Sequence, residues 1–308
     1  MPKHDIARYA TSAKERHQKI LEHCLLWTLR WQFVSDRTLA KMIQTFLESN
    51  RPRIAYQLMR EGWLKACQVP IGHRLLDGKR VYALSEAGRA WCHEHLDLDS
   101  RIIRLHDGTP RPAWGSMQHL LDLQRIFLGT DHLGMLMYWS EPETRRMYSD
   151  QAHDLIPDMV LDFDGAPGLN QVWVEYERSP KNDLRLAHWV NLYAALFRAQ
   201  DQAAHHRALD LAHRQAQASG TYPVDASAEA SPPALLKVIV IVTTKYQRER
   251  YAAAFSVEAA AETYRLRGNN KLQQGKNHLP VAEYIARRVE VFTLAQWLAD
   301  EDSADRDV

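Results

Sequence analysis

The sequence predicts a mixed α+β fold with α/β character, divided into two modules. Two patterns support this fold class. Near the N-terminus, amphipathic helical segments precede two short β-compatible runs, whereas later in the chain apolar, β-branched runs alternate with helical segments. Between these regions, residues 98–115 lose hydrophobic periodicity and collect Gly and Pro, so we expect a linker there. The predicted domains are residues 1–97 and residues 116–308.

Helical segments and a β-hairpin follow one another in the N-terminal module. Apolar positions recur at helical spacing, and Ser35 and Ser85 are suitable N-caps for two of the helices. A turn at Asp77–Gly78 separates the two β-compatible runs. Three helices, a two-stranded wing and a closing helix are typical of a winged helix-turn-helix. The expected elements are helices over 14–34, 35–48 and 54–62, strands over 64–69 and 80–84, and a helix after Ser85.

This module is expected to present a basic surface. Residues 1–112 carry 19 Lys and Arg against 12 Asp and Glu, a local net charge of +7, whereas the remainder carries 20 against 26, or −6. In a winged helix the third helix enters the major groove of DNA and the wing contacts the backbone. The alternative is a winged helix that binds protein or packs against the second module. The predicted DNA-binding residues are Arg51, Arg53, Tyr56, Gln57 and Arg60 on the third helix, and His73, Arg74, Lys79 and Arg80 on the wing.

The C-terminal module is predicted to combine a mixed sheet with flanking helices. A helix over SMQHLLDLQRIFLGT precedes strands in GMLMYWS, IPDMVLDF and QVWVEYE, and Ser179 with Pro180 predicts the start of the next helix. LKVIVIVTT predicts a central strand, followed by a helix near 246–266, a basic loop, a short strand and a closing helix. Residues 216–234, rich in Ala, Ser and Pro, predict a disordered insertion. This order is that of a restriction-endonuclease-like PD-(D/E)XK domain.

Acidic residues near the ends of two of these strands predict a divalent metal site. Asp158 opens one strand, and Glu175 and Glu177 share one face of the next. Adjacent carboxylates repel each other unless a cation lies between them, so Mg²⁺ or Mn²⁺ is the expected cofactor. Glu177 stands where the usual pattern has Lys, and Lys181 is the expected substitute for neutralising phosphate charge. The alternative is that Glu177 and Lys181 form an ion pair at a strand–helix junction.

The segments that hold these acidic residues also resemble a known protein family. PDMVLDF, followed by VWVEYERSPKNDLRLAHWVNLY, is similar to the core of plasmid replication-relaxation proteins and of MobC-type mobilisation relaxases, and the similarity covers roughly residues 15–200. It implies a winged helix before a PD-(D/E)XK-like domain, and Mg²⁺- or Mn²⁺-dependent nicking of double-stranded DNA at a transfer or replication origin. It also implies metal ligands or their supports at Asp158, Glu175 and Glu177, a positive catalytic group at Lys181, and further cleft residues at His119 and Gln124.

The expected function is therefore a metal-dependent DNA endonuclease or nickase at a plasmid or mobile-element origin. The resemblance implies accessory or coupling proteins of conjugation as partners, and a homodimer is compatible with a winged helix. The main alternative is a non-catalytic DNA-binding regulator of replication or transfer on a nuclease scaffold; a transcriptional regulator with a ligand-sensing second domain is a third interpretation.

A conventional relaxase would need a metal-binding His cluster and a Tyr nucleophile. The histidines and tyrosines that could fill these two roles are expected to have other roles in this chain. A solvated helix is the expected location of His205, His206 and His213, and packing is the expected role of Tyr148, Tyr176 and Tyr193.

The composition of the sequence argues against a membrane protein, a secreted protein and a disulfide-rich protein. No apolar run approaches the roughly 20 residues of a membrane span, and the N-terminus lacks the apolar segment of a signal peptide. We therefore expect a cytoplasmic protein with no membrane partner. Cys24, Cys67 and Cys92 form no CxxC pair, which predicts buried or reduced thiols rather than a zinc ribbon or a disulfide framework.

Overall fold

The protein has a mixed α+β fold. The computed structural model describes residues 12–67, 80–96, 114–130, 137–147, 155–162, 171–197, 200, 237–256, 263–267, 271–275 and 288–304. The chain forms two compact units, of which the first comprises Met1–Phe163 and Leu294–Val308 and the second comprises Asp164–Thr293. These bounds differ from the predicted domains, because residues 114–162 and the last helix belong to the first unit. The predicted linker, up to residue 113, and the predicted insertion at 216–234 lie outside the described residues.

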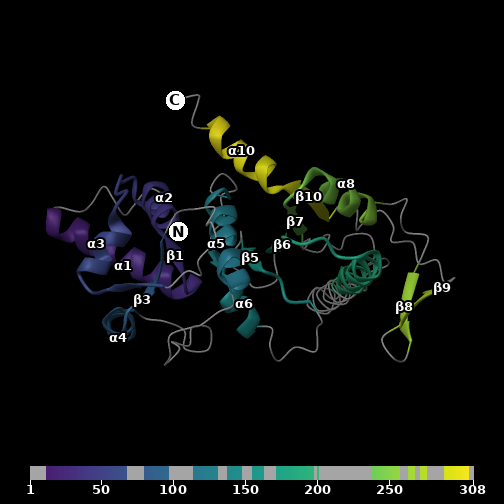
Figure 1. The fold of residues 1–308 in the computed structure, drawn as a ribbon, viewed down its shortest axis with the longest axis horizontal. Coiled ribbons are helices and arrows are strands. Elements are labelled where there is room, and N and C mark those ends of the chain that lie inside the picture. The colour runs from purple at the N-terminus through teal and green to yellow at the C-terminus, as the bar shows by residue number, and fades with distance from the viewer. Residues whose placement is uncertain are drawn as a thin grey trace, which may run out of the picture. The chain divides into compact units, whose positions relative to one another are not determined.

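Capping residues that the sequence displays set the starts of the first helices (Figure 1). Helix α1 (Ala13–Trp31) begins at a capping box of Ser12 and Glu15, and α2 (Asp36–Leu47) begins at Ser35. The predicted helices are thereby confirmed, as are the two predicted strands, and a short strand before α2 is additional. The remaining elements are α3 (Ile54–Arg60), α4 (Glu86–His95), and an antiparallel sheet in the order β1 (Val34–Ser35), β3 (Val81–Leu84) and β2 (Leu64–Ala66).

Helix α4 starts at Ser85, as predicted, and approaches the backbone that leads into β2. The Ser85 hydroxyl donates to the carbonyl oxygen of Gly62 at 2.5 Å. A Cβ atom on Gly88 would lie only 2.3 Å from the carbonyl oxygen of Trp63, which explains why the phrase SEAGRAW has glycine at this position. The closing helix of this region therefore depends on a residue without a side chain.

The rest of the first unit packs against these elements through an aromatic cluster. Trp27 and Trp31 of α1 contact Phe127 and Tyr138, with Trp31 stacked on Tyr138 at a ring-centroid distance of 6.1 Å. Burial of these rings explains why the first unit extends past the predicted domain boundary. The other elements of the first unit are α5 (Trp114–Leu128), β4 (Met137–Trp139), α6 (Glu141–Met147), β5 (Met159–Asp162) and α10 (Leu294–Ala304).

A buried ion pair also joins α1 to α6. The Arg30 guanidinium donates to Glu143 through Nε at 2.7 Å and Nη2 at 3.0 Å, and it lies 3.8 Å from the centre of the Tyr138 ring. Glu143 in turn accepts hydrogen bonds from the backbone N–H and the hydroxyl of Ser140, at 2.7 and 2.9 Å. The first turn of α6 is therefore held by α1. This helix was not predicted, although the sequence Ser140-Glu-Pro-Glu143 has the spacing of a capping box.

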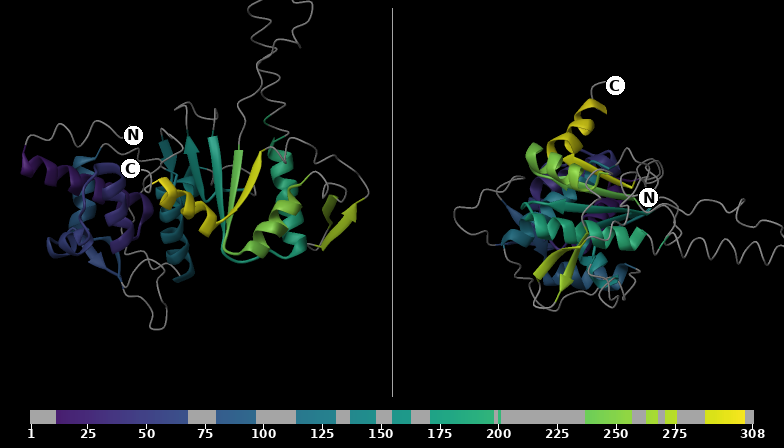
Figure 2. Two further views of the ribbon diagram at one scale, coloured as in Figure 1. Left: turned by 90° about the horizontal axis from the view of Figure 1, so that it is seen from above. Right: turned by 90° about the vertical axis from the view of Figure 1, so that its right-hand side faces the viewer.

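The second unit contains three parallel strands in the order β6, β7, β10 (Figure 2). Its central strand is buried from Val238 to Val242, which confirms the prediction of a strand covered on both faces. Helix 183–197 and α8 pack together through edge-on contacts of Trp189 with Tyr251 and Phe255. The elements are β6 (Gln171–Glu177), β7 (Lys237–Val242), α8 (Lys245–Ala254) and β10 (Val289–Thr293).

Two predictions for the second unit are wrong. The helix after β6 begins at residue 183 rather than at Pro180, because the Asn182 side chain accepts a hydrogen bond from the N–H of Arg185 at 2.9 Å and so provides the N-cap. The predicted helix near 246–266 is shorter, since α8 ends at Ala254. Its last residues and the predicted basic loop include an antiparallel hairpin of β8 (Thr263–Arg267) and β9 (Lys271–Gly275), in which Thr263 pairs with Gly275.

Candidate metal centre

A histidine and two carboxylates converge in the first unit. His119 comes from α5, Glu141 is the first residue of α6, and Asp158 directly precedes β5. The Nε2 atom of His119 lies 3.3 Å from Oδ1 of Asp158 and 3.5 Å from Oε2 of Glu141. One ligand atom of each residue lies within 4.8 Å of the other two. The three side chains are 12–18% exposed, so the group is recessed but open to solvent.

Local contacts hold the two segments that carry the carboxylates, and one of these contacts reaches the Glu141 carboxylate itself. The Thr144 hydroxyl, on α6, lies 2.8 Å from the carbonyl oxygen of Pro157 and 2.9 Å from that of Glu141, so it can donate to either. This contact joins the first turn of α6 to the segment that carries Asp158. Arg145, four residues after Glu141, approaches the Glu141 carboxylate to 2.6 Å through Nη2. The second oxygen of Glu141 faces His119.

The chemistry of these donors fits a divalent transition metal. Carboxylate oxygens are ligands for Mg²⁺ and Mn²⁺, whereas a neutral imidazole is a common ligand of Zn²⁺, Fe²⁺ and Mn²⁺ sites. One imidazole with two carboxylates therefore suits Mn²⁺ better than Mg²⁺. The same atoms could instead form a purely ionic cluster, in which a protonated His119 lies between two carboxylates.

The structure brings together only part of the predicted site. Asp158 and His119 belong to the group, whereas Gln124 does not, because its amide is fully buried between Trp27 Nε1 at 2.8 Å and the carbonyl oxygen of Phe33 at 2.6 Å. Its expected place in a cleft is therefore wrong. Glu141 was missed, and its only signal in the sequence was its position at the start of an unrecognised capping box.

The other predicted catalytic residues lie in the second unit, each with partners there. Glu175 is buried on β6 and accepts a short hydrogen bond from the Tyr193 hydroxyl. Glu177 forms an ion pair with Lys181, whose ammonium group lies 4.4 Å from the centre of the Trp189 ring. Lys181 precedes the helix rather than occupying its first turn, and its backbone N–H donates to the Tyr251 hydroxyl at 3.1 Å.

The ion pair of Glu177 and Lys181 is the arrangement that the sequence left open as the alternative to their catalytic roles. Tyr193 is fully buried among Trp173, Trp189 and Phe197, and Tyr176 is also buried, so both tyrosines pack as expected. Burial raises the pKa of the Tyr251 phenol, although the Lys181 backbone and the charge of Arg250 oppose this effect. Tyr148, His205, His206 and His213 lie outside the described residues.

Basic and polar side chains are exposed along α3. Tyr56 is 39% exposed and lies beside two cations, with Arg60 Nη1 at 3.5 Å from its hydroxyl and the Arg80 guanidinium at 5.9 Å from its ring centre. The hydrogen bond and charge of Arg60, with the charge of Arg80, lower the pKa of Tyr56. Gln57 donates to Glu61 at 2.8 Å. Arg51 and Arg53 are also exposed, whereas His73, Arg74 and Lys79 lie outside the described residues.

Comparison of the chain with protein-family models, with curated proteins and with solved structures gave no match. Among the described residues, no helix combines the length and the apolar character that a bilayer crossing requires. Cys24 and Cys92 are buried free thiols and Cys67 is partly buried, which confirms the prediction for the cysteines.

Proposed function

We propose that this protein is a metal-dependent DNA endonuclease or nickase that acts at the origin of a plasmid or another mobile element. The observation that carries the proposal is the convergence of His119, Glu141 and Asp158, because this donor set suits a divalent cation and includes a residue that the sequence motif singled out. When bound, such a cation would activate a water molecule and polarise a phosphodiester. The resemblance to replication-relaxation and MobC-type proteins supports the choice of substrate.

DNA binding is assigned to the N-terminal elements. The order of α1 to α4 with the antiparallel strands between them supports a winged helix, in which α3 would contact the major groove and Arg80 the backbone. The exposed side chains of Arg51, Arg53, Tyr56 and Arg60 are donors suited to phosphates and base edges. The order of strands and helices after residue 114 supports a PD-(D/E)XK-like domain.

The roles of the remaining residues follow from their contacts. His119, Glu141 and Asp158 would hold the cation, while Arg145 would orient the Glu141 carboxylate and Thr144 would hold the segment that carries Asp158. Lys181 is paired with Glu177 within the second unit, and the positive catalytic role that the resemblance implies for Lys181 stays a prediction. Glu175 would support the strand through its bond to Tyr193.

Metal binding and plasmid cleavage test the proposal together. Wild type should bind Mn²⁺ in isothermal titration calorimetry and convert supercoiled plasmid that carries the element's origin to open circles. Asp158→Asn should lose both properties while it retains DNA affinity. The control is Glu249→Gln, which removes an exposed carboxylate from a surface pair with Lys245 at 3.8 Å and should leave both properties intact. Undiminished cleavage by Asp158→Asn would refute the assignment.

A second candidate is a non-catalytic DNA-binding regulator on a nuclease scaffold. One observation favours it: Glu175 and Glu177, the acids of the strand motif, are both engaged within the protein, by Tyr193 and Lys181. This candidate predicts salt-sensitive origin binding that EDTA does not weaken, and an intact plasmid after incubation with Mn²⁺. Loss of binding in EDTA would count against it.

A further inference from the structure

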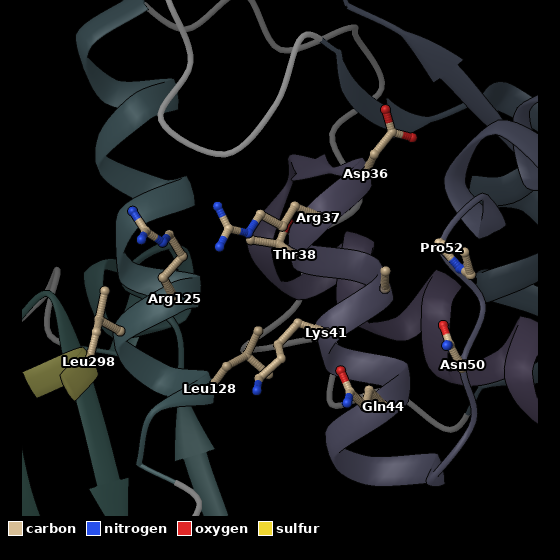
Figure 3. Close-up of a pocket in the computed structure, with 11 residues that line it drawn as sticks. Asp36, Arg37, Thr38, Lys41, Gln44, Asn50, Pro52, Arg125, Leu128 and Leu298 are labelled. Carbon is tan, nitrogen blue, oxygen red and sulfur yellow. The ribbon is translucent and has the colours of Figure 1, made fainter. Parts of the chain in front are cut away.

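A polar groove of about 660 Å³ lies within the first unit and has no role in the proposed function. Helix α2 with Asn50 and Pro52 forms one side, and α5 and α10 form the other (Figure 3). Its volume is in the range of sites that hold small organic ligands or short segments of a polymer. The predicted DNA-reading residues Arg51 and Arg53 are neighbours of Asn50 and Pro52 in the chain, but they are not among the residues that line the groove.

Positive charge from two helices converges on this groove. Arg37 and Lys41 are four residues apart and therefore share one face of α2, and Arg125 approaches from α5 (Figure 3). Like charges at this spacing weaken an isolated helix, so the stability of α2 does not explain them. Among the lining residues the sole carboxylate is Asp36, which lies 3.4 Å from the Tyr82 hydroxyl and whose pKa is raised by burial.

The rest of the lining adds neutral donors and an apolar end. The amides of Gln44 and Asn50 border the groove on the α2 side, and both residues are exposed. Leu128 of α5 and Leu298 of α10 form the opposite wall (Figure 3). A complementary ligand has a strongly anionic group, hydrogen-bonding edges and a flat or apolar portion.

We infer that the groove binds a phosphate ester of a nucleotide. Planar guanidinium groups match the geometry of phosphate oxygens, and Arg37 and Arg125 supply two of them from opposite sides. The amides suit the edges of a base, and the leucines suit its face or the sugar. The phosphate ester belongs either to a DNA strand or to a free nucleotide. Binding of a DNA strand rests on the proposed function, whereas binding of a free nucleotide does not.

Fluorescence anisotropy with two probes tests the inference on the full chain. The probes are a fluorescein-labelled single-stranded oligonucleotide and a fluorescent ATP analogue. The test variant is Arg37→Gln/Lys41→Gln, and the matched control is Lys14→Gln/Arg16→Gln, which removes the same charge from exposed positions of α1. For a DNA source, the slope of log affinity against log salt should fall by about 1.4 in the test variant, at about 0.7 per lost phosphate contact. For a free nucleotide, affinity should fall about tenfold or more.

A third variant keeps the test decisive if the double variant does not fold. Arg125→Gln removes a cation from the other wall, and it should weaken the same probe that the double variant weakens. A defect with the oligonucleotide alone assigns the phosphate to DNA, and a defect with the ATP analogue assigns it to a free nucleotide. Affinities equal to the control for both probes, in every folded variant, would overturn the inference. Retained groove binding in a protein that cuts no plasmid would refute only the proposed nuclease.

Discussion

Replacement of Glu143 by Gln is the most direct test of how α6 is held in place. The Glu143 side chain is 4% exposed and is bonded to Arg30, which is 18% exposed, and to Ser140. Gln keeps the shape and one acceptor oxygen, but it removes the negative charge and directs an N–H₂ group toward a guanidinium. The Arg30 cation would remain buried without its counter-charge.

The cost follows from the burial of this pair. Removal of one partner of a buried ion pair destabilises a protein by about 3–5 kcal/mol. Arg30 keeps its contacts with the carbonyl oxygen and the ring of Tyr138, and it keeps some solvent contact, so we expect the lower end, about 3 kcal/mol. Because Glu141 starts the helix that Glu143 anchors, the Mn²⁺ affinity proposed for this site should fall as well.

Urea denaturation followed by tryptophan fluorescence measures this loss, since Trp27 and Trp31 lie in the core beside the ion pair. Arg30→Met/Glu143→Gln removes the unpaired cation and should be more stable than Glu143→Gln by about 1–2 kcal/mol. A free energy of unfolding for Glu143→Gln within about 0.5 kcal/mol of wild type would show that the pair does not hold α6.

Three further predictions concern other parts of the first unit. Gly88→Ala should destabilise the protein by about 1–3 kcal/mol in the same urea assay, because the new methyl group would meet the Trp63 carbonyl oxygen; an unchanged midpoint would contradict the close approach. Asp36 has a pKa raised by burial above its ordinary value of 3.8, so the native state binds more protons and stability falls as pH rises through this window; Asp36→Asn should flatten that part of the pH profile. Burial raises the pKa of Cys24 strongly and that of Cys67 less, so native protein should react with a thiol reagent at Cys67 first, and equal rates would refute this order.

Much of the fold could be predicted from local sequence patterns. Ser35 and Ser85 cap helices where expected, since an N-cap bonds to N–H groups only three residues away. The buried strand β7 was visible as an unbroken run of β-branched residues. The start of the helix at residue 183 was predicted wrongly, because Ser179 and Asn182 are both good caps and the choice between them is not local. At the helix start, Asp183 bonds to Arg250 of α8 at 2.6 Å, a contact between distant parts of the chain.

Only part of the candidate metal centre could be predicted from the sequence. Asp158 stood out because a Pro-Asp pair opened an apolar run, but Glu141 lies in a helix that was not predicted, and His119 was suggested only by resemblance. Gln124 has the same helical periodicity as His119 and a very different environment, bonded to Trp27 in the core. Sequence spacing therefore does not distinguish a site residue from a core residue on α5.

By itself the sequence determined the type and order of the helices and strands around the site except α6, because caps, periodicity and β-branching act over a few residues. Only the tertiary structure decided which acids meet. The Thr144 hydroxyl lies 2.8 Å from the Pro157 carbonyl oxygen and so joins α6 to the segment that carries Asp158, and the Arg30–Glu143 pair anchors α6 itself. Glu175 instead accepts a hydrogen bond from the Tyr193 hydroxyl. Such contacts join residues far apart in the chain, and their free energies depend on burial that no local pattern encodes.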